Sequence, residues 1–258
     1  MNRIEKKFDE LKTARRKGLV GYLTAGDPDI KRSEANIRIA LVNGLDVLEL
    51  GIPFSDPTAD GPEIQSASLR ALAAGMNIGK ALEMVSRLRR DFDTPIVLFG
   101  YANPFFRYGY RKLCEEAARA GVDGFLVVDL PFEESAEFTT HMKKHDLFFI
   151  PLIAPTTDGA RAKTILRDAK GFVYYIMVTG VTGARTRLAD DVATKVRALK
   201  KRTNLPIAVG FGISSGRQAR LAAEAADAVV AGSALVKAAK DGRLQTFVRE
   251  LRSGLDGA

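Results

Sequence analysis

Two acidic residues stand out because they flank the end of one apolar run. In LELGIPFSDPTADGP, residues 48–62, Glu49 lies inside the run and Asp60 follows eleven positions later, in a stretch rich in Pro, Asp and Gly. A carboxyl group among packed apolar side chains loses hydration, which raises its pKa towards neutrality. Such a group can both donate and accept a proton near pH 7, so Glu49 is a candidate general acid and base.

Each of these acids also has a simpler interpretation. Glu49 could pair with an interior Lys or Arg, but no apolar run of the sequence supplies an obvious partner. Asp60, taken alone, is typical of a turn, where Asp, Pro and Gly are favoured for backbone reasons. A loop as long as the one between Glu49 and Asp60 is more often functional than not, which favours a catalytic Asp60.

Glycines follow two apolar runs near the end of the chain, in GFGISSGRQA and AGSALVKAA. Gly212 and Gly232 let backbone N–H groups approach an oxyanion, and Ser233 adds a hydroxyl that can cap the following helix. A tight turn would explain either glycine alone, but the two together predict a phosphate site. Upstream, VTGVTGARTRL has the composition of a mobile lid and places Thr182 and Gly183 near the ligand.

The elements that must position these residues are short apolar runs separated by amphipathic segments. Such runs are typical of parallel strands that are buried on both faces. Because side chains alternate along a strand, Glu49 should point inward if Val47 does. An Asp follows a Gly before the strand in both NGLDVLEL and AGVDGFLVV, a weak internal repeat. The eight predicted strands are 19–24, 46–50, 95–101, 124–130, 147–154, 172–177, 206–211 and 227–232.

Eight β/α units in 258 residues predict a (β/α)₈ TIM barrel, which we expect to form a single domain over 1–258. The rival, a doubly wound sheet, lacks its dinucleotide fingerprint after the first strand, where the chain reads GYLTAGDP. Ile4, Phe8 and Leu11 have helical spacing and predict an extra N-terminal helix that covers the barrel bottom.

Composition excludes several other classes of protein. The net charge is +8, but the basic residues are scattered through helical segments without interleaved aromatics, so we expect no nucleic-acid partner and an anionic metabolite instead. No apolar stretch is long enough for a membrane helix and the N-terminus has no signal region, which predicts a cytoplasmic protein.

The single cysteine, Cys114, is predicted to be a packing residue. His141 and His145 are expected on a solvated face in the middle of a helix, because no third metal ligand is evident.

Four motifs in order, LELGIPFSDPTADGPEIQSAS, YANP at 101–104, VTGVTGAR and GFGIS, resemble the tryptophan synthase alpha chain family. The resemblance covers essentially the whole chain, and the first motif is specific to the family. It implies a lyase of tryptophan biosynthesis that cleaves indole-3-glycerol phosphate to indole and glyceraldehyde 3-phosphate by a retro-aldol step, without a metal or a cofactor in this chain.

The family's functional positions map onto this sequence residue by residue. The resemblance implies catalysis by Glu49, Asp60 and a tyrosine at Tyr174, although Tyr175 is the neighbouring alternative, and Met177 replaces a serine that is usual in the family. The implied indole-binding residues are Tyr22, Tyr101, Leu126, Thr182 and Phe211, and the implied phosphate-binding residues are Gly183, Gly212, Gly232 and Ser233.

The resemblance also implies a partner, a beta chain that holds pyridoxal phosphate and consumes the indole, in an alpha2beta2 heterotetramer. Pro53, Asp56, Asn103 and Pro104 are expected at that interface. The alternatives are a free-standing indole-releasing lyase, an inactive barrel that acts only as a regulatory subunit, and a different phosphate-handling barrel. The ring-closing relatives among such barrels use a lysine at a strand end, and none of the eight predicted strands ends in one.

Overall fold

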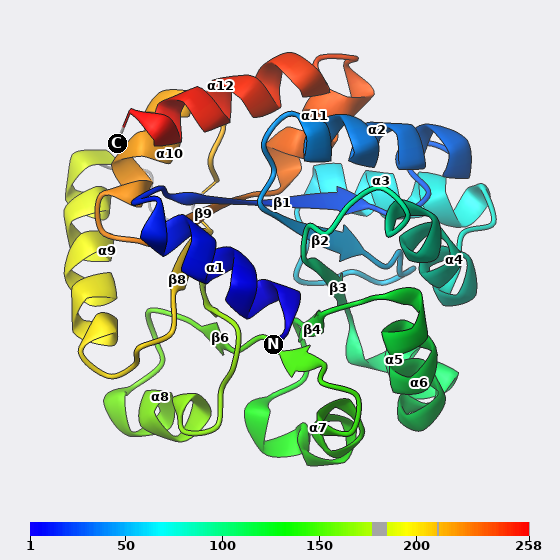
Figure 1. The fold of residues 1–258 in the computed structure, drawn as a ribbon, viewed down its shortest axis with the longest axis horizontal. Helices are drawn as coiled ribbons and strands as arrows, with labels where there is room; N and C mark the ends of the chain where they lie inside the picture. Colours follow the sequence, from blue (N-terminus) through cyan, green and yellow to red (C-terminus); the bar gives the residue numbers. More distant parts are fainter. Residues whose placement is uncertain (177–184, 211, 258) are drawn as a thin grey trace.

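A computed structural model describes residues 1–176, 185–210 and 212–257. Strands and helices alternate along the chain, and the strands curl into a ring with the helices outside it (Figure 1). The strands are β1 Gly18–Thr24, β2 Val47–Gly51, β3 Ile96–Gly100, β4 Gly124–Val127, β5 Phe148–Phe149, β6 Leu152–Ile153, β7 Val173–Ile176, β8 Ile207–Gly210 and β9 Ala228–Ala231.

The helices lie between these strands and at both ends of the chain. They are α1 Arg3–Thr13, α2 Ile30–Val42, α3 Pro62–Ala73, α4 Ile78–Leu88, α5 Ala102–Tyr108, α6 Tyr110–Ala120, the 3-10 turn η1 Phe132–Glu134, α7 Ala136–Lys143, α8 Gly159–Leu166, α9 Arg185–Lys200, α10 Gly216–Ala223, α11 Ser233–Lys240 and α12 Leu244–Asp256. None of the helices within the described residues is long and apolar enough to cross a membrane.

All strand pairs are parallel, in the order β5-β4-β3-β2-β1-β9-β8-β7-β6. The two end strands are pieces of one predicted run, interrupted at Ile150 and at Pro151, which has no N–H to donate. Across the interruption, the Ile150 N–H donates to the Phe125 carbonyl at 2.8 Å, and the Pro151 carbonyl accepts from Tyr174 at 2.9 Å. The ring therefore closes, and the prediction of a (β/α)₈ barrel is confirmed.

Side-chain alternation separates an inner from an outer apolar cluster. Val20, Val47 and Leu126 pack in the barrel interior, whereas Leu48 and Leu50 pack among the surrounding helices. Because Glu49 lies between the two leucines, it shares the interior face of Val47.

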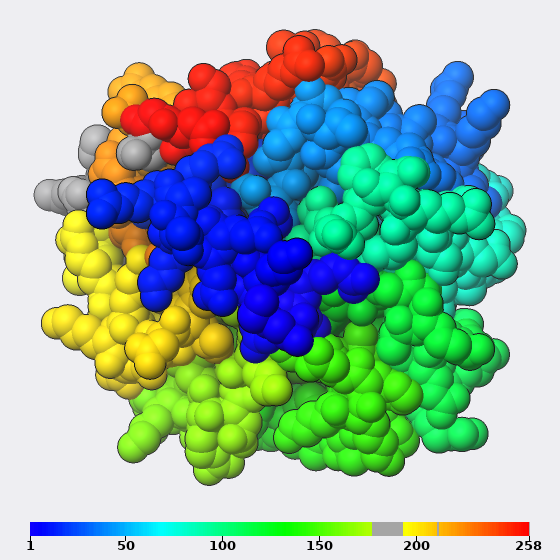
Figure 2. Space-filling model, viewed as in Figure 1, coloured from blue at the N-terminus to red at the C-terminus, as the bar shows by residue number. Residues whose placement is uncertain are grey.

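The helix α1 covers the N-terminal ends of the strands, as predicted (Figures 1 and 2). Ile4, Phe8 and Leu11 are buried and join the inner cluster, and the rings of Phe8 and Phe172 lie 5.4 Å apart. The helix starts at a side-chain cap, because the Asn2 Oδ1 accepts from the Ile4 N–H at 2.9 Å.

The repeated aspartate has a structural cause. At β2, β4 and β9 the Asp before the strand donates its N–H to a carbonyl of the adjacent strand, and its carboxylate accepts the N–H of that same residue. Such a reciprocal pair fixes the register of neighbouring strands at their N-terminal ends. The distance from the backbone N to the carboxylate oxygen is 2.8 Å from Leu19 to Asp46, 2.8 Å from Ile96 to Asp123 and 2.9 Å from Ile207 to Asp227.

One expectation about the histidines was wrong. His141 lies in the last turn of α7, and His145 lies beyond Lys143, where that helix ends. The two side chains therefore do not share a face in the middle of a helix. Among the described residues, no group of three or more His, Cys, Asp or Glu side chains is arranged to hold a metal ion.

Candidate active site

Glu49 is a fully buried acid with no partner among the described residues. Its side chain is 0% exposed, and neither carboxyl oxygen has a hydrogen bond there. In the parallel ladder its Cα lies opposite those of Tyr22 and Val97. Burial raises the pKa of Glu49 to about 8, because it removes the charged form from solvent. Within the part of the chain that the structure describes, the geometry thus agrees with the acid–base interpretation and not with a buried ion pair.

Asp60 is held by its neighbours in the loop between β2 and α3. The Tyr101 hydroxyl donates to Asp60 Oδ2 at 3.0 Å, and the Gln65 side-chain amide donates to the Asp60 carbonyl at 2.9 Å. Burial raises the pKa of Asp60 above its ordinary value, and the hydrogen bond from Tyr101 opposes this shift. The sequence did not reveal the contact with Tyr101, which joins residues 41 positions apart.

Two tyrosines on β7 face opposite ways. Tyr174 packs against the inner cluster, whereas Tyr175 belongs to the cluster that includes Ile165 and Val196 on the surrounding helices. Burial, and then the charges of Glu49 and Asp60, raise the pKa of Tyr174 well above its ordinary value. Tyr174 is therefore the tyrosine that faces the barrel interior, and its hydroxyl stays protonated.

Tyr22, on β1, contributes another tyrosine hydroxyl to the site. It is 4% exposed, and its oxygen accepts a hydrogen bond from the Thr24 hydroxyl at 3.3 Å. The ring lies edge-on to Phe99 with 5.0 Å between the ring centroids, and the hydroxyl oxygen lies 2.2 Å from the position that a Cβ on Gly51 would take. Leu126, another predicted substrate-binding residue, is fully buried in the inner cluster.

The two glycine turns lie side by side. Gly210 of β8 and Val230 of β9 are Cα partners, and Gly212 and Gly232 each follow two residues later, at adjacent strand ends. Gly212 has φ +61°, a left-handed conformation that suits glycine. Gly232 is the N-cap of α11 and Ser233 its first helical residue, so the expectation that the Ser233 side chain caps this helix was wrong. The N-terminus of α11 directs N–H groups towards this mouth of the barrel.

The remaining predicted residues have different positions. Asp56 and Asn103 are exposed and Pro104 is partly exposed, but Pro53 is buried within the chain, so it does not present the surface expected of a partner contact. Thr182, Gly183, Phe211 and Met177 lie outside the described residues.

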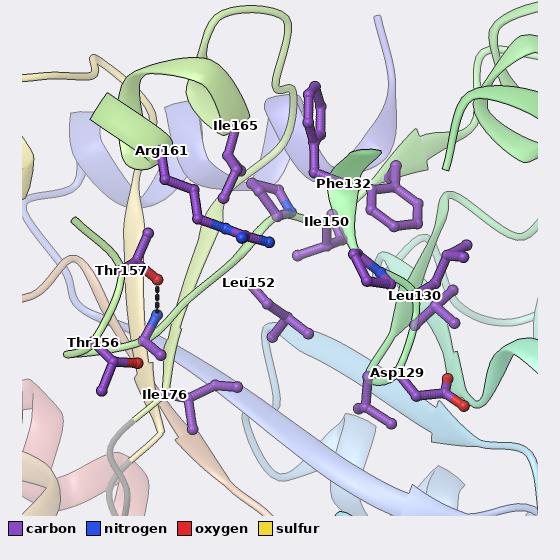
Figure 3. Close-up of a pocket in the computed structure, with 16 residues that line it drawn as sticks. Asp129, Leu130, Phe132, Ile150, Leu152, Thr156, Thr157, Arg161, Ile165 and Ile176 are labelled. Atoms are coloured by element: carbon purple, nitrogen blue, oxygen red, sulfur yellow. Dashed lines mark hydrogen bonds between the residues drawn. The ribbon is translucent and has the colours of Figure 1, made fainter. Parts of the chain in front are cut away.

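A cavity of about 430 Å³, which the sequence did not indicate, lies between the end of β4 and α8 (Figure 3). Leu152 points into it from the interrupted strand, Ile165 lines it from α8, and Arg161 extends its guanidinium group from the same helix. Because Leu152 and Ile150 line the cavity and also pack in or against the inner cluster, the cavity adjoins the barrel interior. Pro151, within an otherwise apolar run, is the residue that could have drawn attention to this place in the sequence.

A closed parallel barrel with a buried acid on an inner strand face, and a second acid in the loop that follows that strand, is the arrangement of a (β/α)₈-barrel enzyme suited to proton transfer. The family profile described as tryptophan synthase alpha chain matches residues 8–252. The tryptophan synthase alpha chain of Geobacter sulfurreducens is 49% identical over 262 residues, covering 99% of each chain. The crystal structure of tryptophan synthase subunit alpha from Legionella pneumophila has a TM-score of 0.93 and 36% identity, covering 100% of each chain. This chain belongs to the tryptophan synthase alpha chain family, a family of lyases.

Proposed function

We propose that the chain cleaves indole-3-glycerol phosphate to indole and glyceraldehyde 3-phosphate in tryptophan biosynthesis. The observation that supports this most directly is the Glu49 carboxyl, which is fully buried and has no hydrogen-bond partner among the described residues. A group in this position with a pKa of about 8 is protonated at neutral pH and can give its proton to a bound ring carbon.

The reaction can be followed through its protons and electron pairs. The Glu49 carboxyl donates its proton to C3 of the indole ring, which leaves a positive charge delocalised onto the ring nitrogen. The resulting carboxylate then takes the proton from the hydroxyl on the side-chain carbon attached to C3. As that C–C bond breaks, its electrons restore the aromatic ring, the aldehyde forms and Glu49 regains its acid form.

Asp60 and Tyr174 complete the proposed catalytic group. As a carboxylate, Asp60 accepts the indole N–H and stabilises the positive charge that develops on the ring nitrogen. Tyr174 has a protonated hydroxyl in the barrel interior and serves as a neutral hydrogen-bond donor. The arrangement supports charge stabilisation by fixed groups that do not need to reorganise during the reaction.

The rest of the mouth suits the two ends of the substrate. Tyr22, Tyr101 and Leu126, with Thr182 and Phe211, form the proposed binding site for the indole ring. Gly212, Gly232 and Ser233, with Gly183, form the proposed phosphate site. Adjacent strand ends and the start of α11 provide backbone N–H groups there, which is the usual position of a phosphate in such barrels.

We also propose that the chain works in the cytoplasm with a beta chain, in an alpha2beta2 assembly. The family name supports a beta-chain partner. Asp56, in the loop that contains Asp60, and Asn103 and Pro104, on α5, present accessible surface and are the proposed contacts. Any pyridoxal phosphate belongs to the beta chain in this proposal, and no cofactor is proposed in this chain.

The test is indole release from indole-3-glycerol phosphate by the purified chain, with and without a beta chain. We expect Glu49→Gln to abolish turnover but to retain substrate binding, whereas the exposed Glu83→Gln on α4 should behave as wild type. Turnover by Glu49→Gln would remove Glu49 from its role. Release of indole by the chain alone at the full rate would favour the free-standing lyase, and no release under either condition would favour the regulatory subunit.

A further inference from the structure

Tyr101 occupies a rigid position between two elements of the site. It follows β3 directly, forms the N-cap of α5 and is 3% exposed. Its ring packs against that of Phe54, with 5.3 Å between the ring centroids. The strand, the helix and the loop therefore all restrict where its hydroxyl can lie.

The hydroxyl of Tyr101 has two polar contacts, which together determine the direction of its proton. The Ala59 N–H donates to the Tyr101 oxygen at 3.0 Å, and the oxygen in turn lies 3.0 Å from Asp60 Oδ2. A backbone N–H can only donate and an ionised carboxylate can only accept. The single phenolic proton therefore points to Asp60 Oδ2, and this oxygen is occupied before any substrate binds.

We propose that Tyr101 is a positioning residue for Asp60: by holding Oδ2, it presents Oδ1 to the indole N–H. This inference rests on the proposed function. Gln65 supports the arrangement through the main chain, because its side-chain amide donates to the Asp60 carbonyl at 2.9 Å and so restrains the backbone of the loop. Tyr101 thus determines both the place of the carboxylate and the oxygen that remains available.

The surroundings of Asp60 make this single hydrogen bond important. The other titratable groups of the described residues that act on this cluster are Glu49, Tyr22 and Tyr174 from the neighbouring strands, and Asp129 near Tyr101. No Lys or Arg of the described residues lowers the pKa of Asp60, and Tyr101 alone opposes the effect of burial. Without the Tyr101 proton, Asp60 should bind a proton more readily, and less of it should be ionised near neutral pH.

The experiment compares Tyr101→Phe with Tyr108→Phe in the full-length chain with its beta chain. Tyr101→Phe keeps the ring that packs on Phe54 and removes only the hydroxyl. Tyr108→Phe is a matched control, because the Tyr108 hydroxyl also donates to a carboxylate, that of Glu116, on helices α5 and α6. We expect Tyr101→Phe to lower kcat by roughly 10- to 100-fold, with a smaller change in KM, and to move the acidic limb of the pH–rate profile to higher pH. Tyr108→Phe should change neither.

Two further arms separate positioning from a structural effect. In an Asp60→Asn background, Tyr101→Phe should cost little more activity, because the carboxylate that Tyr101 positions is already absent. If Tyr101→Phe fails to fold, 3-fluorotyrosine at position 101 offers a test in the opposite direction. Its more acidic hydroxyl should strengthen the bond and move the acidic limb to lower pH.

An active wild type with an unchanged acidic limb in Tyr101→Phe, or an equal loss of activity in the Asp60→Asn background, would overturn the proposal. Absence of indole release by the wild type itself would overturn the proposed function instead.

Discussion

The buried Glu49 predicts that removing its charge should stabilise the protein at high pH while abolishing its activity. The perturbation is Glu49→Gln, which keeps the size and polarity of the side chain but removes its titration. Glu49 has an ordinary pKa of 4.5, and burial raises it to about 8 in the folded chain. Each pKa unit corresponds to about 1.4 kcal/mol of stability, so the full interval amounts to about 5 kcal/mol.

The sign follows from which state binds the proton more tightly. Because the folded state has the higher pKa, the contribution of Glu49 to stability is fully present below about pH 4.5 and is lost as pH rises to about 8. Gln at this position cannot ionise, so its contribution to the free energy of unfolding does not change with pH. The free energy of unfolding of Glu49→Gln, relative to wild type, should therefore rise by several kcal/mol between about pH 5 and about pH 9.

The assay is urea unfolding followed by circular dichroism, near pH 5 and near pH 9, for wild type, Glu49→Gln and the exposed control Glu83→Gln. The informative quantity is how the difference in free energy of unfolding between Glu49→Gln and wild type changes from about pH 5 to about pH 9. Packing effects of the amide that do not depend on pH cancel in this comparison. A difference that stays the same at both pH values would refute the reasoning. It would mean that Glu49 reaches water or a counterion in the folded protein.

Three further results are expected. The pH–rate profile of indole release should fall above about pH 8 as Glu49 loses its catalytic proton, and should fall at acidic pH as Asp60, whose pKa is raised, becomes protonated; a rate that keeps rising beyond about pH 8 would contradict the acid role. Gly51→Ala should lower activity at least about tenfold, because the new Cβ would lie 2.2 Å from the Tyr22 hydroxyl and displace it. Arg252→Ala should lower the free energy of unfolding by about 3–5 kcal/mol, since it removes the cation that pairs with the largely buried Asp46 carboxylate just before β2 and leaves that carboxylate only the Leu19 N–H among the described residues.

Each of the last two variants has a matched control. Gly61→Ala adds a Cβ that meets no atom within 4 Å and should retain activity. Arg16→Ala removes a contact with Asp256 in which both side chains are about half exposed, and it should cost no more than about 1 kcal/mol. If Gly61→Ala lost as much activity as Gly51→Ala, or Arg16→Ala as much stability as Arg252→Ala, the steric and burial arguments would fail.

The barrel was predictable from the sequence because its signals are local. Each strand is a short apolar run between amphipathic segments, and the spacing of Ile4, Phe8 and Leu11 was sufficient to predict α1. The interior orientation of Glu49 followed from the alternation of side chains along one strand. The interruption at Pro151 was not predicted, because an apolar run does not show where its strand hydrogen bonds stop.

The site was predictable only in part, because its contacts join distant elements. Alternation requires Tyr174 and Tyr175 to face opposite ways, but only the packing of Tyr175 against the helices shows which one faces inward. The bond between Tyr101 and Asp60 depends on how the loop after β2 folds over the end of β3. The burial of Pro53 depends on that same folding, and no local pattern specifies it.

The position of α1 has a consequence for the traffic of small molecules. Its apolar face fills the interior at the N-terminal ends of the strands, so that route to Glu49 is blocked. Substrate arrival and the departure of both products must then share the opposite opening, next to the loop that contains Asp60. A molecule bound at the edge of that opening would slow both the entry of substrate and the exit of products. A second substrate molecule can enter only after both products of the first have left.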